Sequence, residues 1–233
     1  RWYISGRAPW ANAYESMIYV AWATALAGLL FIRRSFMTLA LAAFFAGIIL
    51  FVANLNFMDP EITPLVPVLK SYWLMNHVAV ITASYGFFGM SFFLGLLSLG
   101  FMAVGERSAI LQIHIRELRF INEISVYIGL YLLTAGIFLG AVWANESWGR
   151  YWGWDPKETW ALITMIVYAF VLHARFIPSL RSDYVFSIMS VFALSSVLMT
   201  YFGVNYYLSG LHSYGSGDVP PGLHIIFFVF SVI

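Results

Sequence analysis

Long apolar segments alternate with short polar stretches along this chain, and the apolar segments are long enough to cross a membrane. About 20 apolar residues in a helix span the hydrocarbon layer of a bilayer. The pattern predicts six full spans: Tyr14–Ile32, Phe36–Val52, Trp73–Val104, Ile124–Trp143, Trp160–Ile177 and Tyr184–Val204. A seventh apolar run, His224–Ile233, is too short to span, so we expect the chain to be a fragment of a longer membrane protein.

The composition supports this class and excludes others. Hydrophobic residues make up 61% of the 233 residues and charged residues only 10%, against about 25% charged residues in soluble domains. The apolar runs are continuous rather than alternating, which favours helices over a β-barrel. The sequence therefore predicts an all-α, polytopic transmembrane helical bundle that forms a single domain over residues 1–233. A net charge of +1 gives no indication of a nucleic-acid partner, and the lack of cysteine excludes disulfides and thiolate chemistry by this chain.

Two features of the third span go beyond hydropathy. It is too long for a perpendicular crossing, so we expect it to tilt or to project beyond the membrane. It carries His77, Ser84, Ser91 and Ser98 at intervals of seven residues, and small side chains on one stripe favour close helix packing in lipid. The charged segment 105–119 that follows is interpreted as a separate amphipathic helix at the membrane surface.

Positively charged residues in short loops favour the cytoplasmic side of a membrane. The loops on one side hold seven Lys and Arg residues and those on the other side hold five, which is a weak bias. It predicts that the loops 54–72, 145–159 and 205–222 face outward from a plasma (inner) membrane.

The most distinctive polar loop, 145–160, is rich in tryptophan. Within 13 positions it holds Tyr151 and four tryptophans, namely Trp148, Trp152, Trp154 and Trp160. Aromatic residues gather at membrane interfaces in general, so an aromatic belt is one interpretation. The crowding of these rings in one loop favours another, a platform on which a flat, conjugated ligand stacks. Gly149 and Gly153 would let the backbone turn and approach such a ligand closely.

The charged residues of this loop have a structural interpretation. Asp155, Pro156 and Glu158 match the N-cap, N1 and N3 positions of the fifth helix, which is the pattern of a capping box. The two acids are therefore expected to shape the loop rather than to act as catalysts. Arg150 and Lys157 are either solvated loop cations or partners for the carboxylates of a ligand.

Imidazole is a frequent ligand of metals and of haem iron, and the chain has five histidines. His77 lies at the outer end of the third span and His212 in the outer loop after the sixth, so both flank the tryptophan-rich loop and are expected to converge on an iron. His173 lies near the inner end of the fifth span, where an ionisable group indicates function and requires a partner from elsewhere. His114 is assigned to a solvated face, and His224 is a weaker alternative to His212.

The loop also carries a family resemblance. The motif Trp148-Gly-x-x-Trp152-x-Trp154-Asp155 resembles the signature of membrane proteins that handle haem through a so-called WWD domain. Its continuation, Pro-Lys-Glu-Thr-Trp-Ala-Leu, and the segments around His212 and His173 resemble the CcsA branch, the cytochrome c synthases of bacterial and plastid System II. The resemblance extends over nearly the whole chain.

The resemblance implies a reaction and its sites. It implies that haem b binds at the outer face and is joined by thioether bonds to the C-x-x-C-H segment of an apocytochrome c, by a holocytochrome c synthase of the haem lyase type. His77 and His212 would be the axial, catalytic ligands of the outer haem iron. His173 would ligate a second haem in the membrane, opposite a ligand from a CcsB-type partner or a fused N-terminal part. The loop residues expected to contact the outer haem are Trp148, Gly149, Tyr151, Trp152, Trp154 and Asp155.

Two alternatives stay open at this point. A haem exporter or haem chaperone without synthase activity would share the tryptophan-rich loop and both outer histidines. A cytochrome b subunit would need pairs of histidines inside the bundle, whereas only His173 lies at that depth in this chain.

Overall fold

The computed structural model describes the chain except for residues 11, 56–59, 63–69, 106–107, 209 and 213–233. In the described part every regular element is a helix, and six helices are long and apolar enough to cross a membrane. The predicted all-α helical bundle is therefore confirmed. The predicted seventh run, with His224, lies outside the described residues.

The helices follow the predicted spans in order. The long ones are α2 (Ala13–Leu30), α3 (Phe36–Ala53), α4 (Tyr72–Gly105), α5 (Ala109–Trp148), α6 (Pro156–His173) and α7 (Asp183–Leu198). The short ones are α1 (Trp2–Ser5), a 3₁₀ turn at Ala174–Phe176, a π-helical turn at Met199–Gly203 and α8 (Val204–Tyr207). The last two continue α7, so the sixth span runs on to Tyr207.

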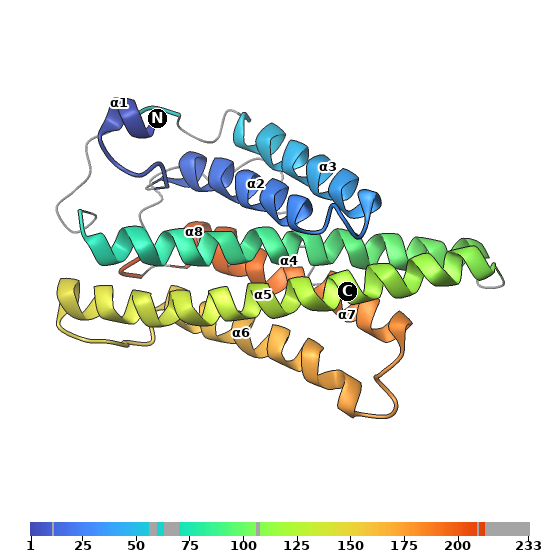
Figure 1. The fold of residues 1–233 in the computed structure, drawn as a ribbon. Coiled ribbons are helices and arrows are strands. Elements are labelled where there is room, and N and C mark those ends of the chain that lie inside the picture. The colour runs from blue at the N-terminus through green and yellow to red at the C-terminus, as the bar shows by residue number, and fades with distance from the viewer. Residues whose placement is uncertain (11, 56–59, 63–69, 106–107, 209, 213–233) are drawn as a thin grey trace.

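The prediction for the charged segment 105–119 was wrong. The residues of this segment from Ala109 onward form the first part of α5, a single helix of 40 residues, rather than a separate surface helix. No proline interrupts this stretch, and Arg119, at its end, lies 3.8 Å from Glu123 and 3.6 Å from Asp183 of α7. At 1.5 Å per residue α5 is roughly 60 Å long. Figure 1 shows α4 and α5 projecting together beyond the other helices.

The serine stripe of α4 packs at the centre of the bundle, where α4 contacts α2, α3, α5 and α7. Ser84, Ser91 and Ser98 are all buried. The Ser91 hydroxyl donates to Asn122 Oδ1 of α5 at 2.6 Å, and Asn122 Nδ2 donates to Ser190 Oγ of α7 at 3.3 Å. Such interhelical hydrogen bonds contribute on the order of 1 kcal/mol each in lipid. The predicted packing role of the stripe is confirmed.

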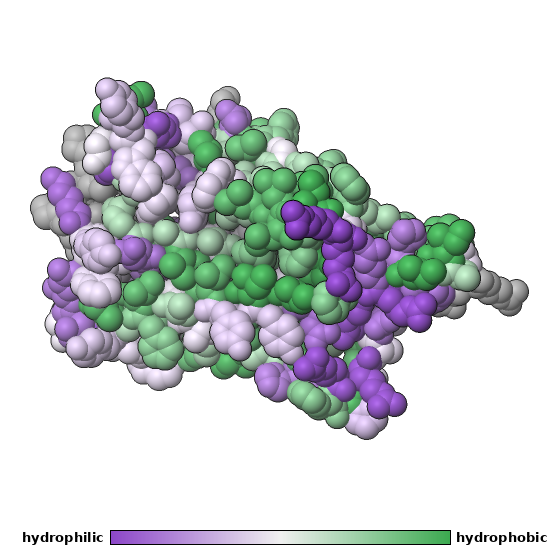
Figure 2. Space-filling view, in the orientation of Figure 1, coloured by the Kyte–Doolittle hydropathy of each residue, from purple (hydrophilic) through white to green (hydrophobic). Residues whose placement is uncertain are grey.

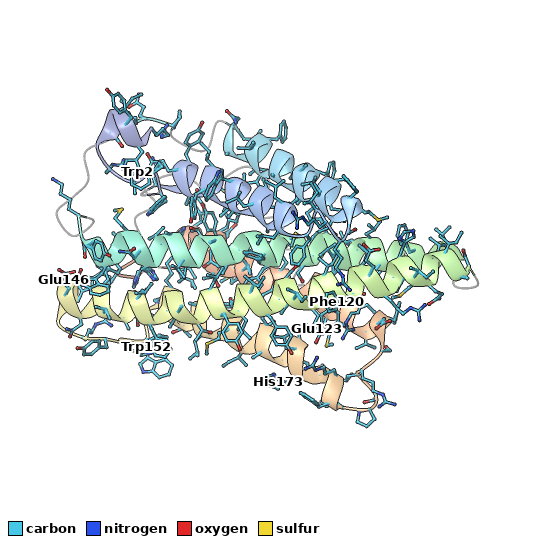
Figure 3. The ribbon with its side chains drawn as sticks, in the orientation of Figure 1. Trp2, Phe120, Glu123, Glu146, Trp152 and His173 are labelled. Carbon is cyan, nitrogen blue, oxygen red and sulfur yellow. The ribbon has the colours of Figure 1, made fainter. Side chains whose placement is uncertain are left out.

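The described helix ends that border the loops expected on the outer side lie toward one end of the bundle. In Figure 1, the start of α4, the connection between α5 and α6, and α1 all lie toward the same end. His173 lies toward the opposite end of α6, as Figure 3 shows. Figure 2 shows an apolar band across the middle of the molecule, with hydrophilic residues gathered on both sides of it. This distribution suits a helix bundle that crosses a membrane.

Candidate functional site

The tryptophan-rich loop is shorter than the sequence suggested. Helix α5 continues to Trp148, and Gly149 then ends it with a φ of 71°, its N–H donating to Asn145 O at 2.9 Å. Glycine adopts a positive φ without the strain that a Cβ would cause. Helix α6 begins at Pro156. The connection is therefore only residues 149–155, and Trp148 is held on the rigid last turn of α5.

The predicted capping box is confirmed at the start of α6. Asp155 Oδ2 accepts the N–H of Lys157 at 3.1 Å, and Glu158 Oε2 accepts the N–H of Asp155 at 3.2 Å. Glu158 Oε2 also accepts the N–H of Gly153 at 2.7 Å, and its other oxygen lies 3.4 Å from Arg150. Glu158 therefore fixes the course of the connection, as a capping residue should.

Asp155 has a second role that the sequence did not reveal. Its Oδ2 accepts the Nδ1–H of His212 at 2.8 Å, and its Oδ1 accepts the N–H of Leu211 at 2.6 Å. Gly210 passes so close that a Cβ there would lie 2.4 Å from Oδ1. The carboxylate thus ties the segment after α8 to the N-terminus of α6.

The protonation states of this pair follow from burial and from each other. Partial burial raises the pKa of Asp155, but the charge of His212 and the hydrogen bonds to this carboxylate outweigh burial and hold the pKa below 3.8. Burial lowers the pKa of His212 by more than the Asp155 carboxylate raises it, so the pKa lies below 6.5. At neutral pH the carboxylate is ionised and the imidazole is neutral. The Nδ1 atom of His212 therefore carries the proton, and Nε2 keeps its lone pair.

His77 has the same tautomer as His212, but its Nδ1 is bound to a different kind of acceptor. Its Nδ1 lies 2.7 Å from the carbonyl oxygen of Gly136 on α5. A carbonyl oxygen only accepts, so Nδ1 carries the proton and Nε2 of the neutral ring keeps its lone pair. Gly140, one turn further along α5, makes room for the ring, since a Cβ there would lie 2.6 Å from its Cε1 atom. Gly140 thus opens a notch in α5 that receives the imidazole, whereas the missing side chain of Gly136 makes room for Ile81 of α4.

Two tryptophans connect the histidines. Trp143, only 1% exposed, has its ring centroid 6.3 Å from that of His77 in a nearly parallel arrangement and 5.4 Å from that of His212. Trp148 lies 4.8 Å from Trp143 and 5.0 Å from His212. The structure thus brings together His77, His212, Trp148 and Asp155 from the predicted set. We call these four residues and Trp143 the histidine–tryptophan cluster.

The sequence analysis missed Trp143, which it treated only as the end of a span. A signal was available in the spacing of Gly136, Gly140 and Trp143. These positions are four and three residues apart, so they share one face of a helix. Two glycines followed by a tryptophan on one face indicate a place where a neighbouring helix approaches the backbone closely.

The other loop aromatics lie outside the cluster. Tyr151 and Trp154 are 61% and 70% exposed, and Trp152 packs edge-on against Trp154 at 5.7 Å. In Figure 3, Trp152 points away from the helices. Trp154 has a φ of 58°, a left-handed conformation that destabilises a residue other than glycine by about 1–3 kcal/mol. The connection therefore presents exposed aromatic rings despite a conformational penalty.

His173 and His114 lie apart from the cluster. His173 is exposed near the end of α6, with its Nδ1 2.7 Å from the carbonyl oxygen of Ala169, so its Nε2 is also the ring nitrogen left without the proton in the neutral form. Its ring neighbour is Phe176, at 6.0 Å between centroids. His114 lies 3.7 Å from Glu117 on the same helix, which agrees with its assignment to a polar face.

Comparison with known proteins identifies the family. Residues 10–212 match the family described as cytochrome C assembly protein. This chain belongs to the cytochrome c assembly protein family. The match covers α2 to α7 and ends at His212, so the whole histidine–tryptophan cluster lies inside the part of this cytochrome c assembly protein that matches the family.

Individual relatives agree with the resemblance to the CcsA branch. The chain is 54% identical to Protein NrfI of Wolinella succinogenes over 222 residues, which cover 95% of this chain and 25% of that protein. It is 38% identical to the cytochrome c biogenesis protein CcsA of Prochlorococcus marinus, over 92% of this chain and 78% of the relative. The corresponding protein of Chlorella vulgaris is 35% identical, with 92% of this chain and 80% of the relative covered. This chain thus spans a quarter of the length of NrfI and most of the length of CcsA.

Proposed function

We propose that this protein binds haem at the outer membrane face through His77 and His212 and joins it to the C-x-x-C-H segment of an apocytochrome c. One observation carries the proposal. His77 donates its Nδ1–H to the Gly136 carbonyl oxygen and His212 donates its Nδ1–H to the Asp155 carboxylate, and both rings lie beside Trp143. The Nε2 atom of each histidine is therefore left as an electron-pair donor. Histidines that ligate metals typically have such a second partner, which fixes the tautomer and raises the basicity of the ring. Membership of the cytochrome c assembly family supports the choice of haem and apocytochrome as ligands.

The proposed reaction needs little from the protein besides positioning. Thioether formation adds a thiol S–H bond across a haem vinyl group, so that sulfur bonds one carbon, the proton ends on the other, and no net oxidation occurs. The chain has no cysteine, so both thiols come from the apocytochrome. Holding two reactants in a productive geometry can contribute roughly 7–11 kcal/mol. Trp143 and Trp148 hold the histidines, and the exposed rings of the 149–155 connection offer faces for a flat macrocycle.

We extend the proposal to the inner end of α6. Like His77, His173 has its Nδ1 bound to a backbone carbonyl oxygen. Its ring is exposed, whereas those of His77 and His212 are partly buried. It would ligate a second haem together with a group from a CcsB-type partner or from a fused N-terminal part. The much greater length of NrfI supports such a fusion. We place the cluster on the periplasmic side of the plasma membrane, in agreement with the distribution of Lys and Arg between the loops.

The function is tested by expressing the full-length protein with an apocytochrome c in a host without its own cytochrome c assembly system. Haem should remain on the apocytochrome after extraction with acidified acetone, because thioether bonds survive this treatment. An apocytochrome with both thiols replaced by alanine is the control and should yield none. An exporter or chaperone would carry haem on itself and give no covalent product, which would decide for that alternative.

A test of the His77 notch follows from the geometry of Gly140. In Gly140→Ala the added Cβ would lie 2.6 Å from Cε1 and 2.7 Å from Nδ1 of His77, so the ring must leave its hydrogen bond to Gly136. Haem affinity, measured from the low-spin absorption band during titration, should fall roughly tenfold to a hundredfold. Gly100→Ala on α4 is the control, because no atom lies within 4 Å of its added Cβ. Equal affinities in the two variants would show that the notch does not orient His77.

A further inference from the structure

Lys157 occupies a distinctive position beside the histidine–tryptophan cluster. It is the second residue of α6 and its side chain is partly buried. Its Nζ donates to Asn205 Oδ1 of α8 at 2.8 Å. The Asn205 amide is fixed in turn, because its Nδ2 donates to the carbonyl oxygen of Tyr201 at 2.6 Å. A neutral amide oxygen is therefore held against the ammonium group by the helix that leads to His212.

Among the described residues, no carboxylate lies within ion-pair distance of the Lys157 ammonium. Asp155 is near enough to act on its charge, but both oxygens of Asp155 already accept hydrogen bonds from Leu211, His212 and the Lys157 backbone. An ammonium offers three donors, of which the Asn205 oxygen uses one. Removing a cation from water is unfavourable unless an anion compensates it. The site is thus suited to an anion that the described residues do not themselves supply.

Arg150, the other cation of the loop, does have a carboxylate partner. Arg150 lies 3.4 Å from Glu158 and close to the ring of Trp148, at 5.8 Å from its centroid. The Glu158 carboxylate therefore compensates the charge of Arg150. The sequence offered Arg150 and Lys157 as equal candidates for binding ligand carboxylates, and the structure distinguishes them in favour of Lys157.

Lys157 also lies beside the part of the cluster that holds His212. The backbone N–H of Lys157 shares Asp155 Oδ2 with the His212 ring. An anion bound at Lys157 would therefore belong to the same ligand that His212 binds through iron. Haem is such a ligand, because it carries two propionate carboxylates on one edge of the macrocycle.

We propose that Lys157 binds a propionate carboxylate of the outer haem, with Asn205 positioning the ammonium. The contact fixes the rotation of the macrocycle about the axis through the iron. The propionate edge faces the start of α6, and the vinyl groups are directed away from Lys157 toward the incoming thiols. This inference rests on the proposed function, since it assigns the orientation of the same haem.

The test compares two probes, haem and haem dimethyl ester, in which both carboxylates are masked but the iron and vinyl groups are unchanged. Each is titrated into the purified full-length protein and into its Lys157→Met and Arg150→Met variants. Lys157→Met should weaken haem binding roughly tenfold to a hundredfold, as expected when one partner of a charged hydrogen bond is lost. It should leave the affinity for the ester unchanged, and Lys157→Arg should restore most of the affinity for haem. Arg150→Met should behave as the wild type with both probes.

The outcomes separate this inference from the function on which it rests. Equal weakening of both probes by Lys157→Met would give Lys157 a structural role and overturn the propionate contact. Unchanged haem binding in that variant would overturn it as well. If neither probe gave a low-spin spectrum with the wild-type protein, the proposed function itself would fail. Low-spin binding of the ester by Lys157→Met also shows that this variant is folded.

Discussion

Replacing either His77 or His212 by alanine is expected to abolish the low-spin spectrum that added haem gives at the outer site of the purified protein. Low-spin haem iron requires two strong axial ligands, and each substitution removes one of the two Nε2 donors that the cluster presents. The yield of covalent cytochrome c should fall by roughly 100-fold, because a haem held from one side is no longer positioned for the thiols. Absorption spectra of the purified variants and haem staining of the co-expressed cytochrome measure the two effects.

His173→Ala is the matched control for this experiment. It removes a histidine with the same hydrogen-bonding arrangement, but at the other end of α6 (Figure 3). We expect it to lower the total haem content while the low-spin signal of an outer site loaded with added haem persists. Added imidazole should restore the low-spin signal of His77→Ala, because a free ligand can take the place of the missing ring. Normal cytochrome yields from both outer variants would show that axial ligation is not required.

The helices could be predicted because each signal was local. Continuous apolar runs place α2, α3 and α4 within one or two residues, since the length needed to cross the hydrocarbon layer is fixed. The start of α6 was equally local, because Asp155, Pro156 and Glu158 form a capping box within four residues. The charged start of α5 was misassigned for the opposite reason. Arg119, at the end of this segment, lies 3.6 Å from Asp183 of α7, and a contact between residues so far apart in the chain is invisible to a local pattern.

The site depended on contacts that no local pattern contains. The bond between Asp155 and His212 joins residues 57 positions apart, and that between His77 and Gly136 joins residues 59 positions apart. The spans are apolar on all sides, so hydropathy does not indicate which face of α5 turns toward α4. The histidines and the tryptophan loop could thus be named from the sequence, but the role of Trp143 and the separation of Trp148 from Trp154 required the packed helices.

Asp155→Asn should impair haem binding far more than Glu158→Gln, although the two acids belong to the same capping box. Asp155 accepts donors with both oxygens, from Leu211 N–H on one side and from His212 and Lys157 on the other. An asparagine must turn its NH₂ group toward one of these sides, so a donor then faces a donor. Either the segment carrying His212 is released, or its ring changes tautomer and Nε2 becomes protonated. We expect haem affinity to fall roughly tenfold to a hundredfold.

The Glu158→Gln variant keeps more of the native hydrogen bonds than Asp155→Asn does. The glutamine oxygen can still accept the backbone N–H groups of Asp155 and Gly153, and only the pair with Arg150 is lost, because the NH₂ group then faces this donor. A partly exposed pair of this kind contributes at most about 1 kcal/mol. Haem affinity in this variant should therefore stay within a few-fold of the wild type, as judged by the same titration.

The pH dependence of haem affinity in Asp155→Asn shows whether Asp155 acts by orienting the His212 ring or by changing its protonation. Burial lowers the pKa of His212 and the Asp155 carboxylate raises it, so removing this charge lowers the pKa further. The imidazole consequently remains neutral to lower pH in the variant than in the wild type. Weak haem binding at neutral pH cannot then come from protonation of the ring, and raising the pH should not restore it. Recovery of affinity at higher pH would show instead that Asp155 acts by keeping His212 deprotonated, and the orienting role inferred from its hydrogen bonds would be wrong.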